Sequence, residues 1–166
     1  SRQNIVFAEY FGKIIYKMAA EKLTPVTLEL GGKSPCIIES DANLKVAARR
    51  IAIAKFSNCG QMCVAPDYLL VHESVKNELI GELKSTIKDF FSEQPSSDYN
   101  YGRMINEKQF NRVTGYLKDG QIVFGGKHDK SSLYIEPTIL DKVSPDSSIM
   151  KEEIFGPVLP ILTFCA

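Results

Sequence analysis

The residues best suited to chemistry are two cysteines within the stretch Asn58-Cys59-Gly60-Gln61-Met62-Cys63-Val64-Ala65-Pro66. This stretch follows an amphipathic run and precedes an apolar one, so the two thiols lie where a helix should end and a strand should begin. A thiol at such a junction can face a cleft while rigid elements hold it on both sides. Because a thiolate is a good nucleophile, Cys63 is a candidate nucleophile, although packing as a small hydrophobic residue is an equally good interpretation.

Cys59 lies four residues before Cys63 and is predicted to end the preceding helix. It could serve as a resolving thiol for Cys63, but packing is the favoured interpretation. We expect no metal site, because two cysteines lack the further ligands that a four-coordinate metal requires. His72 and His128 are isolated in the sequence, and we interpret them as strand-end and loop residues rather than as partners of Cys63.

A candidate general base precedes the cysteines. Residues 26–30 alternate apolar and polar side chains and predict a strand that stops at Gly31-Gly32. Glu29 then lies at the carboxyl end of this strand, on the face opposite the leucines, and the ligands of open α/β sheets gather beyond such ends. The Glu29 carboxylate could therefore act on a bound ligand as a general base. Periodicity alone nevertheless favours a solvated strand residue followed by an ordinary glycine turn.

A third segment that could do chemistry is Lys151-Glu152-Glu153-Ile154-Phe155-Gly156-Pro157. Its carboxylates could accept hydrogen bonds from sugar hydroxyls, and Phe155 could stack on a flat ring. Taken alone, the segment is more typical of a surface turn with Phe155 tucked into the protein. A functional interpretation therefore depends on combining it with the other two stretches.

Helices and strands that alternate along the chain must position these three stretches. Apolar residues at helical spacing predict helices over residues 11–23, 41–58, 75–91 and 107–117, with Ser40-Asp41, Ser74 and Asn106 as capping residues. Alternation and short apolar runs predict strands over residues 26–30, 35–39, 68–72, 121–124, 134–140 and 158–164. Residues 92–102 and 127–132 are predicted loops. The order predicts an α/β fold with a mainly parallel sheet and crossover helices.

The composition excludes several classes of partner. The 166-residue chain has 20 basic and 20 acidic residues, so no broad electrostatic field favours nucleic acid or an anionic membrane, and a small molecule is the better default. The longest apolar runs are too short to span a bilayer. Four cysteines are too few for a disulfide scaffold, so we expect reduced thiols and an intracellular, cytoplasmic location.

Taken together, the three stretches resemble the signatures of one enzyme family. Their order, and the spacing from Glu29 to Cys63, are similar to those of the NAD(P)-dependent aldehyde dehydrogenase superfamily. The matching motifs are Leu28-Glu29-Leu30-Gly31-Gly32-Lys33-Ser34-Pro35, Gly60-Gln61-Met62-Cys63 and Glu152-Glu153-Ile154-Phe155-Gly156-Pro157. Two further stretches resemble its class 3 branch: Leu23-Thr24-Pro25-Val26-Thr27 and Cys63-Val64-Ala65-Pro66-Asp67-Tyr68. This branch includes fatty and aromatic aldehyde dehydrogenases. The resemblance covers nearly the whole chain.

The resemblance implies NAD(P)-dependent oxidation of aldehydes to carboxylic acids. In the family the cysteine of the GQxC motif is the nucleophile, which implies Cys63 rather than Cys59. It would form a thiohemiacetal with the aldehyde, hydride would pass to the nicotinamide of NAD or NADP, and a thioester would remain. Glu29, the glutamate of the ELGGK motif, would then activate water to hydrolyse the thioester.

The resemblance also implies cofactor-binding residues. Glu153 would bind the nicotinamide ribose, and Phe155 would pack near the nicotinamide. The backbone around Leu30 and Gly31 would approach the carboxamide, and the N–H of Cys63 would form part of the oxyanion site. The substrate would be a small-molecule aldehyde. The whole protein is expected to be a homodimer, for which membrane association stays open.

The resemblance predicts a division into two domains. Family members are roughly three times as long as this chain, judged against ordinary domain sizes. The first residue is not methionine and the last residues end an apolar run, so we expect a segment of a longer protein. Residues 1–30 are predicted to be the C-terminal remnant of the dinucleotide-binding domain, and residues 31–166 a catalytic domain truncated at its C-terminus. In the stretch 7–13 only Gly12-Lys13 matches the family's glycine-rich turn.

Alternatives concern the chain as it stands. Because most of the cofactor site would lie outside it, the isolated chain could be catalytically inactive and serve as a folded structural or interaction unit. It could also hydrolyse esters through the Cys63 thiol without a cofactor, since nucleophile and base both remain. A redox switch between Cys59 and Cys63 is a less favoured interpretation.

Overall fold

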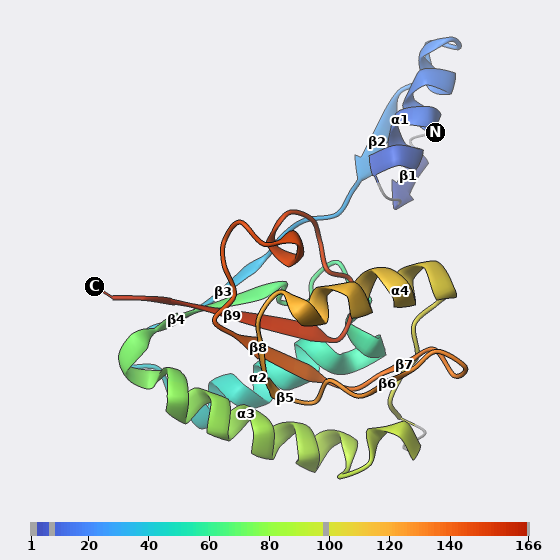
Figure 1. Cartoon of the computed structure of the whole chain (residues 1–166). Coiled ribbons are helices and arrows are strands. Elements are labelled where there is room, and N and C mark those ends of the chain that lie inside the picture. Colours follow the sequence, from blue (N-terminus) through green and yellow to red (C-terminus); the bar gives the residue numbers. More distant parts are fainter. Residues whose placement is uncertain (1–2, 7–8, 98–99, 166) are drawn as a thin grey trace. The chain divides into compact units, whose positions relative to one another are not determined.

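A computed structural model of the chain describes residues 3–6, 9–97 and 100–165 (Figure 1). The chain forms two compact units, Ser1–Gly32 and Lys33–Ala166, and each is described by itself. Phe7 and Ala8, part of the stretch compared with a glycine-rich turn, lie outside the described residues.

The first unit, Ser1–Gly32, is a strand–helix–strand element. Strand β1 (Gln3–Val6) pairs in parallel with β2 (Val26–Glu29), and helix α1 (Glu9–Ala20) connects them. In β2 the half-buried and exposed residues alternate as predicted, with Glu29 exposed at the carboxyl end. A Cβ at Gly12 would lie 3.0 Å from Leu30 Cδ2, so helix and strand approach closely there.

The second unit, Lys33–Ala166, is built on a five-stranded sheet of order β3-β4-β9-β8-β5. Its strands are β3 (Pro35–Ile38), β4 (Tyr68–His72), β9 (Val158–Phe164), β8 (Thr138–Asp141) and β5 (Gln121–Phe124). The first four are mutually parallel, and β5 joins β8 as an antiparallel edge strand. The predicted α/β fold with a mainly parallel sheet is confirmed.

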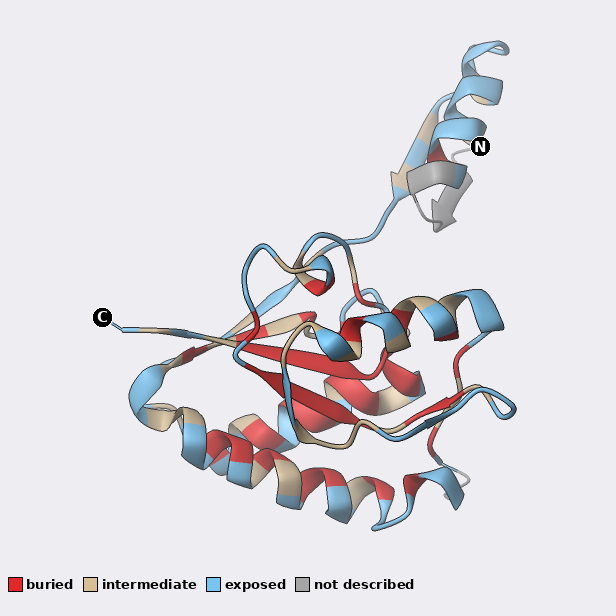
Figure 2. Ribbon diagram, viewed as in Figure 1, coloured by how far each residue is buried: buried red, intermediate tan, exposed pale blue. Residues whose placement is uncertain are grey.

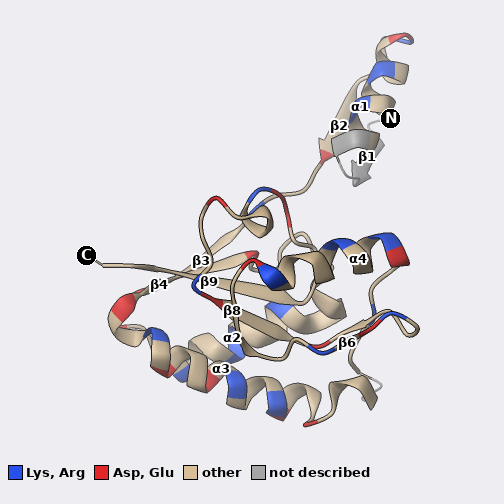
Figure 3. Ribbon diagram, in the orientation of Figure 1, with Lys and Arg blue, Asp and Glu red and all other residues tan. Residues whose placement is uncertain are grey.

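Three helices accompany this sheet: α2 (Leu44–Phe56), α3 (Lys76–Phe91) and α4 (Glu107–Gly115). Helices α2 and α3 pack against each other. Buried residues concentrate on the central strands and on the inner sides of α2 and α3 (Figure 2). The predicted apolar stripe of α3 is buried at Leu79, Leu83, Ile87 and Phe91. Basic and acidic residues are dispersed over the outer sides of the elements (Figure 3).

Two of the three predicted caps are wrong. Helix α2 begins after Asn43, whose Oδ1 accepts a hydrogen bond from the Val46 N–H at 3.2 Å, because Ser40 and Asp41 lie in a turn closed by the Ala42 N–H. Ser74 lies inside a 3₁₀ turn, Glu73–Val75, that precedes α3. The third cap is confirmed, since Asn106 Oδ1 accepts a hydrogen bond from the Gln109 N–H at 2.9 Å at the start of α4.

The predicted strand over residues 134–140 is two strands. Pro137 separates β7 (Tyr134–Ile135) from β8, because proline has no N–H to donate to a ladder. Strand β7 pairs instead with β6 (His128–Asp129), so part of the predicted loop 127–132 is a short strand. His128 therefore lies on a strand rather than in a loop. The predicted loop 92–102 contains a 3₁₀ turn, Pro95–Ser97, and residues 98–99 lie outside the described part of the chain.

Candidate active site

The thiol turn, residues 57–65, connects the end of α2 to the approach to β4. After α2 the chain forms a 3₁₀ turn, Ser57–Gly60, in which Asn58, Cys59 and Gly60 have φ values of 50°, 57° and 71°. Three consecutive left-handed residues reverse the chain sharply, at an energetic cost for the two that are not glycine. A second turn follows, closed by the Ala65 N–H and the Met62 carbonyl at 3.1 Å, and Cys63 lies in it with an exposed side chain.

The side chain of Gln61 fastens the thiol turn to the segment before α4. Its Nε2 donates to the carbonyls of Asn58, at 3.1 Å, and Arg103, at 3.0 Å. Its Oε1 accepts a hydrogen bond from the Ile105 N–H at 3.0 Å. Because both ends of the carboxamide are engaged, Gln61 holds the residues around Cys63 against a second segment. In the sequence Gln61 is recognisable only as a member of the GQxC motif.

Cys59 is packed inside the second unit. Its Sγ lies 3.9 Å from the Tyr101 hydroxyl oxygen and 3.9 Å from Met104 Sδ. Burial raises the pKa of the Cys59 thiol to about 11, and the hydrogen bond to Tyr101 only partly opposes this. A thiol with so high a pKa stays protonated at neutral pH, so Cys59 is poorly suited to be a nucleophile or a resolving thiol. All four cysteines of the chain are free thiols.

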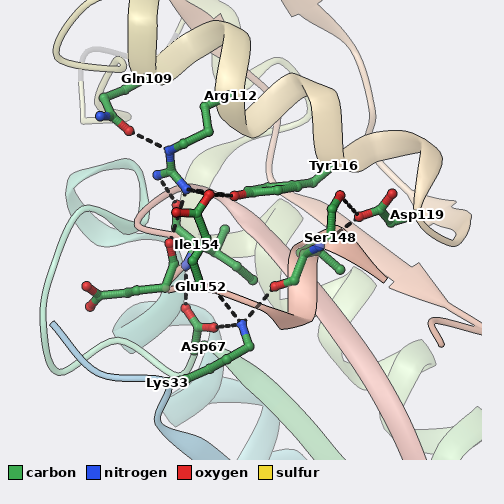
Figure 4. A network of polar contacts seen from close by, with 11 residues as sticks. Lys33, Asp67, Gln109, Arg112, Tyr116, Asp119, Ser148, Glu152 and Ile154 are labelled. Carbon is green, nitrogen blue, oxygen red and sulfur yellow. Dashed lines mark hydrogen bonds and ion pairs between the residues drawn. The ribbon is translucent and has the colours of Figure 1, made fainter. Parts of the chain in front are cut away.

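The cofactor segment, residues 151–157, is fixed mainly through its backbone (Figure 4). Arg112 of α4 donates from Nη1 to the Glu153 carbonyl, at 3.1 Å, and from Nη2 to the Ile154 carbonyl, at 2.7 Å. Phe155 follows with a left-handed φ of 47°. Phe155 is 39% exposed, so it is not tucked into this part of the protein as the turn interpretation predicted.

Tyr116 adds a side-chain contact to this segment. Its hydroxyl donates to Glu152 Oε1 and accepts a hydrogen bond from Arg112 Nη1 at 3.0 Å. Burial, with the Glu152 carboxylate, raises the pKa of the Tyr116 hydroxyl to about 12, so it remains a donor over the neutral range.

Lys33 and Asp67 form an ion pair beneath the cofactor segment. Lys33 Nζ also donates to the carbonyls of Ile149 and Glu152, and Asp67 Oδ1 accepts a hydrogen bond from the Ile154 N–H. In the sequence both residues are recognisable only as members of longer motifs. Their pairing is a contact that spacing alone did not predict.

The thiol turn and the cofactor segment are in direct backbone contact. A Cβ at Gly60 would lie 2.3 Å from the Gly156 carbonyl oxygen, so only glycine fits at position 60. The structure thus brings the turn that carries Cys63 against the segment that carries Glu153 and Phe155. Glu29, Leu30 and Gly31 belong to the first unit, where all three are exposed.

A buried lysine lies in the last turn of α2, close to these segments. Lys55 is only 1% exposed. Burial lowers the pKa of its ammonium group to about 8, an effect that the carboxylates of Asp67 and Glu153 oppose and the charge of Lys33 reinforces. Lys55 follows Ile51 by four residues, so its side chain lies on the buried face of α2.

Neither a metal centre nor a membrane span is evident in the described residues. Among residues 3–6, 9–97 and 100–165, no group of three or more histidine, cysteine, aspartate or glutamate side chains could hold a metal ion. Within the same residues, no helix is sufficiently long and apolar to cross a bilayer.

Comparison with known proteins explains why the thiol turn and the cofactor segment occur together in this chain. A sequence model of the aldehyde dehydrogenase family matches residues 8–166. The chain belongs to this family. The 4,4'-diaponeurosporen-aldehyde dehydrogenase of Staphylococcus aureus (strain NCTC 8325 / PS 47) is 55% identical over 159 residues, which cover 95% of this chain and 35% of that protein. Aldehyde dehydrogenase family 3 member A2 of Mus musculus is 51% identical over 92% of this chain and 31% of that protein. The resemblance to the class 3 branch is confirmed.

Solved aldehyde dehydrogenases share the fold. The substrate-bound state of Staphylococcus aureus AldH matches with a TM-score of 0.95 and 51% identity, covering 99% of this chain and 36% of that chain. An indole-3-acetaldehyde dehydrogenase in complex with NAD+ matches with a TM-score of 0.83 and 34% identity, covering 98% of this chain and 36% of that chain. The chain spans about a third of the length of these family members.

Proposed function

We propose that the whole protein oxidises aldehydes to carboxylic acids with NAD or NADP as acceptor, and that this chain supplies the nucleophilic thiol. The observation that carries the proposal is the backbone contact between the turn of Cys63, an exposed thiol, and the segment of Glu153 and Phe155. The names of the relatives in the aldehyde dehydrogenase family support the same reaction.

In the proposed mechanism Cys63 Sγ attacks the aldehyde carbon and forms a thiohemiacetal, while the Cys63 N–H donates to the developing oxyanion. A bound nicotinamide cofactor supplies the hydride acceptor for conversion to a thioester. Glu29 then takes a proton from water as the water oxygen attacks the thioester carbon. The carbon–sulfur bond breaks, which releases the carboxylic acid and restores the Cys63 thiolate.

The cofactor segment fits a nicotinamide nucleotide. The Glu153 carboxylate can accept hydrogen bonds from ribose hydroxyls, and the exposed ring of Phe155 can contact a flat heterocycle. In the first unit, the backbone of Leu30 and Gly31 would approach the carboxamide. Relatives include a dimeric NADP-preferring aldehyde dehydrogenase of Rattus norvegicus and the indole-3-acetaldehyde dehydrogenase solved with NAD+. We therefore propose either nucleotide as the cofactor and a homodimer as the assembly.

Within the same proposal, residues 1–30 are the end of a dinucleotide-binding domain and residues 31–166 belong to the catalytic domain. The compact units of the structure divide close to this boundary, between Gly32 and Lys33. The isolated chain would then lack most of the cofactor site. Its inactivity, a cofactor-free thiol esterase activity and an intracellular location stay predictions.

The nucleophile is tested by Cys63→Ser in the full-length protein, with Cys165→Ser, which changes another exposed thiol, as the matched control. Cys63→Ser should lower aldehyde oxidation by more than about a thousandfold, because an alcohol is a far weaker nucleophile than a thiolate, and should leave cofactor binding measurable. Cys165→Ser should be indistinguishable from the unchanged protein. Retention of activity by Cys63→Ser would disprove the assignment.

The same assay tests the general base with Glu29→Gln. This variant should still form the acyl-enzyme but hydrolyse it slowly, so a burst of reduced nicotinamide should precede a steady rate lowered by at least about a hundredfold. Glu39→Gln, which changes another exposed carboxylate near a strand end, is the control and should show no such change. A steady rate in Glu29→Gln equal to that of the control would contradict the role of Glu29.

A further inference from the structure

The Lys33–Asp67 pair contacts the cofactor segment and the 3₁₀ turn, Ser148–Met150, that precedes it. Beyond the ion pair itself, Lys33 Nζ donates to the Ile149 carbonyl at 2.8 Å and to the Glu152 carbonyl at 2.9 Å. An ammonium group has three N–H donors, and these three contacts use all of them. Lys33 therefore binds the backbone on both sides of residue 151.

Asp67 complements this arrangement with its second oxygen. While Oδ2 accepts from Lys33, Oδ1 accepts a hydrogen bond from the Ile154 N–H at 2.8 Å. The backbone N–H of Asp67 donates to the Ser34 carbonyl at 2.8 Å, which ties the residues next to Lys33 to the start of β4. Asp67 is only 3% exposed, so its charge depends on these donors.

The ion pair and Arg112 of α4 bind successive peptide groups of the cofactor segment (Figure 4). Lys33 binds the Glu152 carbonyl, Asp67 binds the Ile154 N–H, and Arg112 binds the carbonyls of Glu153 and Ile154. The peptide groups on both sides of Glu153 are thus held before the chain reaches Phe155. A left-handed φ at a bulky residue persists only where its surroundings impose it, and these contacts supply that constraint.

We propose that Lys33 and Asp67 are positioning residues, which fix the backbone of residues 152–155 so that Glu153 and Phe155 are preorganised to bind a nicotinamide nucleotide. This inference rests on the proposed function of the cofactor segment. Lys33 follows Glu29 by four residues, and Asp67 follows Cys63 by four residues. The ion pair and Cys63 lie in the same compact unit as the cofactor segment.

The experiment compares cofactor binding with cofactor-free chemistry in the full-length protein. In Lys33→Met the Kd for NAD or NADP, measured by calorimetry, should rise by at least about tenfold, because the buried Asp67 carboxylate loses its charged partner and the carbonyls of Ile149 and Glu152 lose their donor. Cys63-dependent hydrolysis of an activated aryl ester should change by less than about threefold. If Lys33 had a purely structural role, Lys33→Met would weaken cofactor binding and slow ester hydrolysis together.

Two further variants serve as comparisons for Lys33→Met. Asp67→Asn retains an oxygen acceptor for the Ile154 N–H and loses only the negative charge, so it should raise the Kd less than Lys33→Met does. Lys130→Met removes a lysine from an exposed ion pair with Glu107 and should leave the Kd unchanged. If Lys33→Met does not fold, as judged by circular dichroism, Asp67→Asn provides the deciding measurement.

Failure of this inference is distinguishable from failure of the proposed function. An unchanged cofactor Kd in folded Lys33→Met and Asp67→Asn would overturn the positioning role while Cys63 remains essential for aldehyde oxidation. Equal losses of ester hydrolysis and aldehyde oxidation with an unchanged Kd would overturn it as well. Full aldehyde oxidation by Cys63→Ser would instead refute the proposed function.

Discussion

At the scale of single residues, Gly60 connects the thiol turn to the cofactor segment. Its φ of 71° is the third of three left-handed values, and its α-carbon faces the Gly156 carbonyl. Any side chain would have to displace backbone there, since a Cβ would also lie 3.0 Å from the Lys55 carbonyl oxygen. The contact between the two segments therefore depends on the absence of a side chain at this position.

Gly60→Ala should accordingly destabilise the protein by at least about 2 kcal/mol, through a backbone clash and left-handed strain together. Urea unfolding of the chain followed by circular dichroism measures this loss. Gly81→Ala is the matched control, because Gly81 lies within α3 and a Cβ there meets no atom within 4 Å. It should stabilise the chain by about 0.5–1 kcal/mol. Equal effects of the two substitutions would contradict this account.

At the scale of elements, α2 carries the chain into the thiol turn and its start is set by Asn43. Ser40, Asp41 and Asn43 are all residue types that cap helices, so composition alone could not choose among them. The choice depends on a turn closed by the Ala42 N–H and the Glu39 carbonyl at the end of β3, which places Ser40 and Asp41 before the helix.

Asn43→Ala should lower the free energy of unfolding by about 1 kcal/mol, because the Val46 N–H loses its side-chain acceptor. Ser40→Ala should change it by less than about 0.5 kcal/mol, the usual range for a surface substitution. Urea unfolding of both variants decides the matter. A larger loss in Ser40→Ala than in Asn43→Ala would restore the cap that the sequence predicted.

At the scale of the whole molecule, burying the Lys55 charge opposes folding. Its pKa is lowered from 10.5 to about 8, so the penalty is fully present below pH 8, where folded and unfolded chains are both protonated. Between pH 8 and 10.5 the unfolded chain binds more protons, and the penalty is relieved as the pH rises. The buried thiol of Cys59 acts in the opposite direction, since its pKa is raised from 9.0 to about 11 and its contribution to stability is lost between pH 9 and about pH 11.

The difference in unfolding free energy between the unchanged chain and Lys55→Met isolates the lysine. It should shift by roughly 3 kcal/mol in favour of the unchanged chain between pH 8 and pH 10.5, since one pKa unit corresponds to about 1.4 kcal/mol. Urea unfolding across this range provides the measurement. Lys45→Met, which changes an exposed lysine of the same helix, is the matched control. A flat difference for Lys55→Met would mean that the pKa of Lys55 is the same in the folded and the unfolded chain.

Local patterns in the sequence determined most of the elements and the three motifs. Alternation located β2, and apolar runs located β4 and β9, because side-chain periodicity depends on neighbours within a few residues. The motif resemblance selected Cys63 over Cys59 and assigned Glu153 and Phe155 to the cofactor. Each of these features is a short run of residue types, so it can be recognised from the sequence alone.

Only the tertiary structure decided which residues support those motifs. Lys33 and Asp67 are 34 residues apart, and Asp67 and Ile154 are 87 apart, so no local pattern could indicate their contacts. Burial of Cys59 and Lys55 likewise depends on segments that are distant in sequence. The physical reason is that desolvation and hydrogen bonding of a buried group are set by whatever the fold places around it, whereas helix and strand patterns are set along the chain itself.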